Sequence, residues 1–227
     1  MTTVSRPATL STAAISRFGR RRQAVLGAAL ALLVAGCSTT LLPKPPQPPA
    51  LCALDVAASA PAAPARTATT AARPTLLVNP PRAAAGFDTR NIVYLRQPHR
   101  IEHFAYSQWV DTPAQMLAPL IARAIEQSGA FDAVLLAPTA AAGELRLDTE
   151  VIRLQQDFGS TPSVARFTLR AVLLDIGTRR VVAVREFDAS APAPSNDVPG
   201  GVAAANRAVQ QVLGELAAFV ATASAPR

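Results

Sequence analysis

Alternation of apolar and charged side chains between residues 145 and 187 constrains the fold of this chain more than any other feature. Its first stretch interleaves Leu145, Leu147, Thr149 and Val151 with Arg146, Asp148 and Glu150. A period of two puts the sets on opposite faces of a strand, so one face packs on a core and the other meets water. The apolar pair Val151-Ile152 breaks the phase and predicts a β-bulge that re-aims Leu154 and Phe158.

Two further alternating stretches predict an antiparallel meander. The first has one apolar and one polar face, made by Phe167, Leu169, Ala171 and Leu173 against Arg166, Thr168 and Arg170. The second covers 181–187 and follows the turn-forming sequence Asp-Ile-Gly-Thr-Arg at 175–179. Shorter strand candidates precede the meander at 51–56, 75–79, 91–95, 100–106 and 131–138.

Two amphipathic helices complete the predicted fold. The first begins at Thr112, an N-cap followed by Pro113 and by Gln115 for a capping box, and ends at Ser128-Gly129. Pro119 lies inside it and should kink or weaken the helix. The second follows a proline-rich loop at 191–199 and Gly200-Gly201, with one apolar side made by Val202, Val209, Val212, Leu213, Leu216, Phe219 and Val220. Both helices on one face of a mixed, mostly antiparallel sheet give an α+β domain.

The first 36 residues have the pattern of a signal peptide that is removed. Arg17 and the arginines at 20–22 precede an uncharged run at 24–35, which is too short to span a membrane as a mature helix. It ends in Val-Ala-Gly-Cys at 34–37, which resembles a bacterial lipobox. We therefore expect cleavage between Gly36 and Cys37 and acylation of Cys37, rather than a buried helix that ends in a chance cysteine. Arg21-Arg22 leaves twin-arginine export open, but ordinary secretion is favoured because Ala24 and Val25 are not bulky.

The expected lipid anchor predicts where the protein resides. Two or three acyl chains would hold it firmly on a membrane that it does not cross. Ser38 stands where an Asp would favour retention at the inner membrane, so we expect the periplasmic face of the outer membrane. The proline-rich stretch 37–50 is an extended spacer, and the domain at 51–223 contains a low-complexity stretch, 57–73, expected to be a disordered insertion.

Charge and cysteine content exclude several function classes. The chain has 22 Lys and Arg against 15 Asp and Glu, but five arginines and no acids precede Cys37, so the mature protein carries a net charge of +2. Its arginines are interleaved with acids, which argues against nucleic acid as a partner. Because lipidation uses the Cys37 sulfur, Cys52 has no intramolecular partner; it is expected to be a buried small hydrophobe, with an intermolecular disulfide as the alternative.

Residue types that carry chemistry are scarce in the predicted domain. His99, Glu102 and His103 could hold a metal in principle, but surface histidines are the favoured interpretation because the spacing is wide in a strand. No nucleophile elbow or phosphate-binding glycine loop occurs, so we expect no enzyme and no cofactor. For Arg146, Arg153, Arg166 and Arg170, cross-strand pairing with Asp148, Glu150 and Asp157 on a solvated sheet face is favoured over a lipid-headgroup patch. Trp109 is expected to be a core or rim anchor.

Several of these motifs together resemble the ABC-type transport auxiliary lipoprotein component family. They are the lipobox, Asn-Ile-Val-Tyr at 91–94, Tyr-Ser-Gln-Trp-Val-Asp-Thr-Pro at 106–113, the helix end at 128–134, the strand at 145–158 and Gly-Val-Ala-Ala-Ala-Asn-Arg-Ala at 201–208. The chain departs from the family pattern at the insertion 57–73 and at Phe219, where Trp is frequent.

The resemblance implies a non-enzymatic role in transport between membranes. Family members accompany an ATP-binding protein, a permease and a mammalian-cell-entry (MCE) domain protein in systems that move phospholipid or other hydrophobic molecules. This chain would be the outer-membrane piece that docks the MCE protein, and a homo-oligomer is compatible with that role. The alternative is a structural or assembly lipoprotein that binds another outer-membrane protein or peptidoglycan; a periplasmic hydrolase ranks third.

Overall fold

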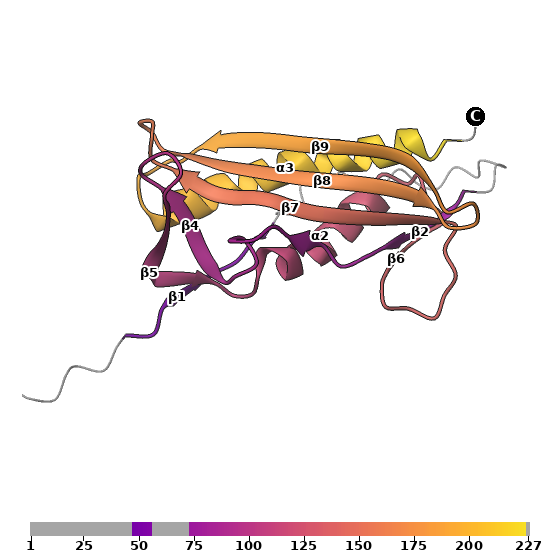
Figure 1. Ribbon diagram of the computed structural model, residues 1–227, viewed down its shortest axis with the longest axis horizontal. Coiled ribbons are helices and arrows are strands. Elements are labelled where there is room, and N and C mark those ends of the chain that lie inside the picture. Colours follow the sequence, from indigo (N-terminus) through magenta and orange to yellow (C-terminus); the bar gives the residue numbers. More distant parts are fainter. Residues whose placement is uncertain (1–46, 56–72, 226–227) are drawn as a thin grey trace, which may run out of the picture. The chain divides into compact units, whose positions relative to one another are not determined.

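The computed structural model describes residues 47–55 and 73–225. The predicted signal peptide, Gly36, Cys37, most of the spacer and nearly all of the predicted insertion lie outside these residues. From Pro48 onward, the described residues belong to one compact unit. It is an α+β domain with one mixed sheet and two long helices, as predicted (Figure 1). No helix among the described residues is long and apolar enough to span a membrane.

The long strand β7 (Leu145–Asp157) organises the sheet. One edge of β7 pairs antiparallel with β8 (Val164–Asp175), which pairs in turn with β9 (Arg180–Pro192). The other edge is filled by three short parallel strands in succession: β2 (Thr75–Val78), β3 (Arg82–Ala83) and β4 (Asn91–Leu95). The segment 75–95 therefore runs alongside β7 as three separate strands. The hydrophobic pattern of the sequence does not predict this arrangement.

Three more strands extend the two ends of this edge. At one end, β4 pairs antiparallel with β5 (Ile101–Trp109), and β5 pairs parallel with β1 (Ala50–Cys52). At the other end, β2 pairs parallel with β6 (Ala133–Leu136). Figure 1 shows the β1–β5–β4 group and the β2–β6 pair at opposite ends of β7.

Two helices cover one face of the sheet. Helix α2 (Pro113–Gln127) begins at Thr112, whose side chain accepts from the Gln115 N–H, and continues without interruption through the exposed Pro119. Helix α3 (Val198–Ala223) is capped by Asp197 and packs along β8 and β9. Their apolar faces and the inward side chains of β7 and β8 form the core, which includes Leu117, Ile121, Leu147, Phe167, Leu169, Val212 and Leu216.

Several boundaries differ from those expected. β5 continues to Trp109 because it pairs with β1 there, and β9 continues to Pro192, so the loop before α3 is shorter than 191–199. Gly200 and Gly201 lie in the first turn of α3 rather than ahead of it. The predicted bulge is confirmed as a register shift between Val151 and Arg153, after which Leu154 is buried. The predicted turn at 175–179 is also confirmed, with the Asp175 carboxylate accepting from the Thr178 N–H.

Candidate functional site

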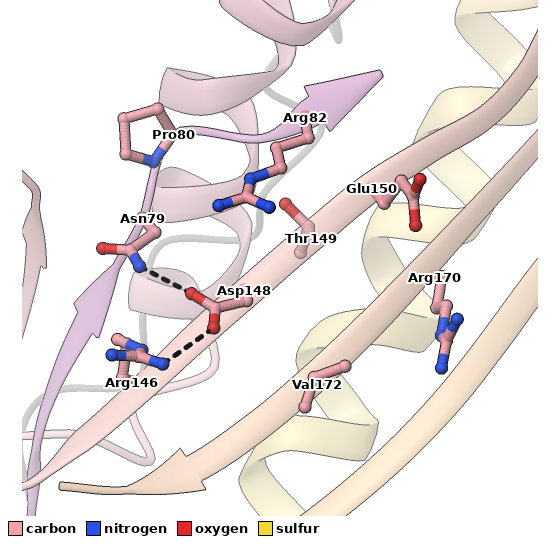
Figure 2. Close-up of a pocket in the computed structure, with 9 residues that line it drawn as sticks. All are labelled: Asn79, Pro80, Arg82, Arg146, Asp148, Thr149, Glu150, Arg170 and Val172. Atoms are coloured by element: carbon pink, nitrogen blue, oxygen red, sulfur yellow. Dashed lines mark hydrogen bonds and ion pairs between the residues drawn. The ribbon is translucent and has the colours of Figure 1, made fainter. Parts of the chain in front are cut away.

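A polar hollow of about 450 Å³ opens beside the charged face of β7. It forms where the parallel edge of β7 is interrupted: three residues lie between Val78 and Arg82, whereas two lie between their partners Leu147 and Glu150. The extra residue falls at Pro80-Pro81, which cannot donate hydrogen bonds to a neighbouring strand. The hollow is lined by Asn79, Pro80, Arg82, Arg146, Asp148, Thr149, Glu150, Arg170 and Val172 (Figure 2).

Asp148 is the most fully engaged group in this hollow. Its carboxylate accepts a hydrogen bond of 2.6 Å from Asn79 Nδ2 and lies 3.1 Å from Arg146 Nη2. Figure 2 shows these two contacts, each to a different oxygen of the Asp148 carboxylate. The Asn79 contact ties the end of β2 to β7, and the Arg146 contact holds one guanidinium at the wall of the hollow. Asp148 is therefore already paired, and its charge is largely compensated.

Other polar groups of the hollow have no partner among the described residues. The Thr149 side chain is 5% exposed and its hydroxyl makes no hydrogen bond, and the buried Nε of Arg146 makes none either. No ion pair involves Arg82 or Arg170 within the described ranges. In Figure 2 the Thr149 hydroxyl points toward the Arg82 guanidinium. Buried polar groups normally find a partner, so this arrangement is unusual.

Two further ion pairs join β7 to β8 and β9. Arg153 Nη2 lies 2.9 Å from Asp188 Oδ1, and Arg166 Nε lies 3.1 Å from Asp157 Oδ2. The Thr168 hydroxyl donates to Asp188, and this bond together with Arg153 holds the pKa of Asp188 below its usual range. Cross-strand pairing is thus confirmed for Arg166, whose partner is Asp157. Arg146 pairs instead with Asp148 of its own strand, and Arg153 pairs with Asp188 of β9, which was not among the expected acids. Arg170 faces Glu150 in the strand register without an ion pair in the described chain.

The histidines are surface residues. His99 and His103 are both exposed, and His99 has a positive φ in the turn between β4 and β5. Among residues 47–55 and 73–225, no group of three His, Cys, Asp or Glu side chains is placed to hold a metal. Glu102 instead accepts a 3.0 Å hydrogen bond from the Tyr94 hydroxyl, and burial and this bond raise the pKa of Tyr94.

Trp109 is a core anchor. It is 3% exposed, and its backbone N–H donates to the Arg90 carbonyl while the Arg90 side chain donates back to the Trp109 carbonyl. Cys52 pairs with Trp109 in the β1–β5 register and is a half-buried free thiol whose pKa is raised by burial. This agrees with the expected small hydrophobe, although Cys52 is less buried than predicted.

Asn206 of α3 holds the segment that follows β1. Its Oδ1 accepts a 2.7 Å bond from the Asp55 N–H, and its Nδ2 donates to the carbonyls of Ala53 and Val202. The amide therefore joins the N-terminal edge of the sheet to the N-terminal part of the closing helix. Asn206 belongs to the motif at 201–208 that resembles the family pattern. The sequence alone did not indicate that its side chain holds the segment after β1.

Sequence reasoning missed the residues that make the hollow. It singled out Arg146 and Arg170 but not Arg82, Asn79 or Thr149. Arg82 lies in a two-residue strand, and Thr149 occupies a core-face position of β7. The one sequence signal for the hollow is the Asn-Pro-Pro-Arg run at 79–82, which marks a break between strands without indicating what faces it.

The family model for the ABC-type transport auxiliary lipoprotein component matches residues 56–217, so the chain belongs to that family. Protein XCC0632 from Xanthomonas campestris is 28% identical, with a TM-score of 0.66 over 76% of this chain and 95% of that one. An uncharacterized protein of 10% identity shares the fold, with a TM-score of 0.59 over 77% and 99%. No curated protein matches the chain.

Proposed function

We propose that this protein is an outer-membrane lipoprotein that docks the periplasmic end of an MCE-domain protein in an ABC-type system for hydrophobic molecules. The observation that carries the proposal is membership of the transport auxiliary lipoprotein family. The lipobox and Ser38 support an acyl anchor on the periplasmic face of the outer membrane. A protein held in this way acts by fixing a partner to the membrane, which is a non-enzymatic role.

The outer edge of β9 is the surface that we propose for docking. Among the described strands β9 pairs with β8 alone, so its other edge presents unpaired backbone groups over 13 residues. Val181, Val182 and Val184 are large apolar side chains exposed on this strand. A long edge strand with apolar side chains favours strand addition by another chain. We take that chain to be the MCE protein; a second copy of this lipoprotein is the competing occupant.

A pull-down of the purified mature lipoprotein against the periplasmic part of its MCE protein tests the proposal. We expect binding at tens of micromolar or better, an affinity of at least about 6 kcal/mol. Val184→Lys should weaken it at least about tenfold, because a charge would be placed on the apolar edge. Leu136→Lys is the matched control, since Leu136 is exposed to a similar extent, 40% against 50%, on the distant strand β6.

Two results would count against MCE docking. No binding at tens of micromolar, together with an intact permeability barrier in cells that lack the protein, would favour a structural envelope lipoprotein. A Val184→Lys variant that retains MCE binding but loses self-association would instead assign the β9 edge to a homo-oligomer.

A further inference from the structure

We propose that the polar hollow between β2, β3, β7 and β8 binds a phosphate group. The proposal does not depend on MCE docking, because it rests on the lining of the hollow alone. Three guanidinium groups from three strands reach this hollow: Arg82 from β3, Arg146 from β7 and Arg170 from β8. Two carboxylates, Asp148 and Glu150, accompany them, so the lining carries one excess positive charge.

The pairing within the hollow leaves donors free for a ligand. Asp148 already receives Asn79 Nδ2 and Arg146 Nη2. Arg82 makes no hydrogen bond or ion pair within the part of the chain that the structure describes, so its guanidinium can form a two-point contact with an oxyanion. The exposed position of Arg82 keeps that guanidinium accessible from solvent.

Thr149 provides a second, independent indication of a ligand. Its side chain is 95% buried, lines the hollow and has an unpaired hydroxyl, while the buried Arg146 Nε also has no partner. A buried hydroxyl without a partner costs free energy unless something completes its bonding. Thr149 and Arg82 point toward one another in Figure 2, so an oxyanion held by Arg82 would lie on the side to which the Thr149 hydroxyl points.

The ligand chemistry favoured by this arrangement is phosphate rather than carboxylate. Donors reach the hollow from both sides of β7, and a tetrahedral group offers oxygens in several directions, whereas a carboxylate offers two in one plane. The volume of about 450 Å³ exceeds that of a phosphate, so the hollow also admits the atoms to which a phosphate ester is attached. Either a phospholipid headgroup or a free phosphate would supply this group.

Phosphorus NMR of the mature lipoprotein in dodecyl maltoside micelles tests the site, since this detergent contains no phosphorus. Three probes are titrated at constant ionic strength: inorganic phosphate, glycerol 3-phosphate and glycerophosphoglycerol, the water-soluble diester of a phospholipid headgroup. We expect line broadening that saturates with at least one probe. Tighter binding of the diester assigns the site to a headgroup, and tighter binding of inorganic phosphate assigns it to the free ion.

Arg82→Gln should weaken binding of that probe about tenfold or more, since a charge-assisted contact is lost. Arg170→Gln should weaken it to a smaller extent. Arg123→Gln on α2 removes the same charge from an exposed arginine outside the hollow and should change binding less than about twofold. Circular dichroism checks that each variant is folded. Absence of saturable broadening, equal effects of Arg82→Gln and Arg123→Gln, or stronger competition by acetate than by phosphate would overturn the proposal.

Discussion

Single residues of α3 determine how the N-terminal edge of the sheet is held. Asn206 makes three hydrogen bonds, two of them to the segment after β1. Asn206→Ala should therefore lower the free energy of unfolding by about 1–2 kcal/mol. It should also speed labelling of the Cys52 thiol in the folded protein, because β1 would open more often. Urea unfolding and a thiol-labelling time course measure the two effects.

Gln210→Ala provides the control for Asn206. Gln210 is exposed on the same helix and makes no hydrogen bond among the described residues, so both measurements should stay at wild-type values. An unchanged Cys52 labelling rate in Asn206→Ala would show that β1 is held by its pairing with β5 instead. The wild-type protein should migrate identically with and without reductant.

Asp197 makes the stability of the folded protein depend on pH. The Ser195 hydroxyl and the Gly200 N–H both donate to its Oδ1 and lower its pKa below the usual range. A carboxyl whose pKa is lower in the folded state stabilises the protein at neutral pH, and this contribution is lost as the pH falls below about 4. Asp197→Ala should thus lower the thermal midpoint at pH 7 and have a smaller effect at pH 3.

Thermal unfolding of the wild type, Asp197→Ala and Asp132→Ala at the two pH values measures this difference. Asp132 is exposed and its side chain makes no hydrogen bond in the described part of the chain, so its removal should matter little at either pH. An equal loss at pH 7 and pH 3 for Asp197→Ala would mean that the ionised carboxylate contributes nothing to the helix cap.

The residues that sequence reasoning identified share one property: their role follows from their own neighbours in the chain. Thr112 caps α2 through a bond three residues away, and Leu147 or Phe167 is buried because of its place in a period of two. Arg82 and Thr149 were missed because their significance depends on strands that are remote in sequence. The same holds for Asn206, whose partners Ala53 and Asp55 precede it by most of the domain.

At the scale of elements, the first turn of α3 depends on two glycines without side chains. A Cβ on Gly201 would lie 2.0 Å from Gln156 Oε1, and Gln156 is buried and bonded to Ser163. Gly201→Ala should therefore destabilise the protein by about 1–3 kcal/mol, since the helix must move away from β7. Chemical denaturation measures the change.

Gly214 in the same helix is the matched comparison. A Cβ there meets nothing within 4 Å, and the position is exposed. Gly214→Ala should stabilise the protein by about 0.5–1 kcal/mol, because alanine loses less backbone freedom than glycine in a helix. Destabilisation by both substitutions to the same extent would rule out close packing on Gln156 as the cause.

Elements with long periodic patterns were predicted well, and those formed by remote pairing were not. β4 has the expected range. In β7 and β8 the burial of successive side chains follows the predicted alternation, because a half-buried strand must alternate between a core face and a solvent face. β3 was not predicted, since two residues carry no period. The parallel pairings of β7 were likewise not predicted, because the sequence between 75 and 95 gives strand positions but not their partners.

At the scale of the whole molecule, the expected acyl anchor determines where the domain works. Cys37→Ser removes the thiol that would carry the diacylglycerol, so the signal peptide should remain uncleaved and the protein should not reach the outer membrane. Membrane fractionation and the mass of the purified protein measure both effects. Cys52→Ser is the control and should localise normally. Outer-membrane recovery of Cys37→Ser at wild-type levels would contradict lipid anchoring.

The arrangement of three short strands along β7 also affects the order in which the parts of the chain fold. A ribosome makes β2, β3 and β4 long before the strand on which they lie, whereas β8 and β9 follow β7 at once and α3 closes over them. Contacts between residues that are close in sequence form first, so β7, β8, β9 and α3 should fold soon after they are synthesised. The strands β2, β3 and β4 cannot pair until β7 has been made. Pulsed hydrogen exchange during refolding should show protection in β8 before β2; the reverse order would refute this sequence of events.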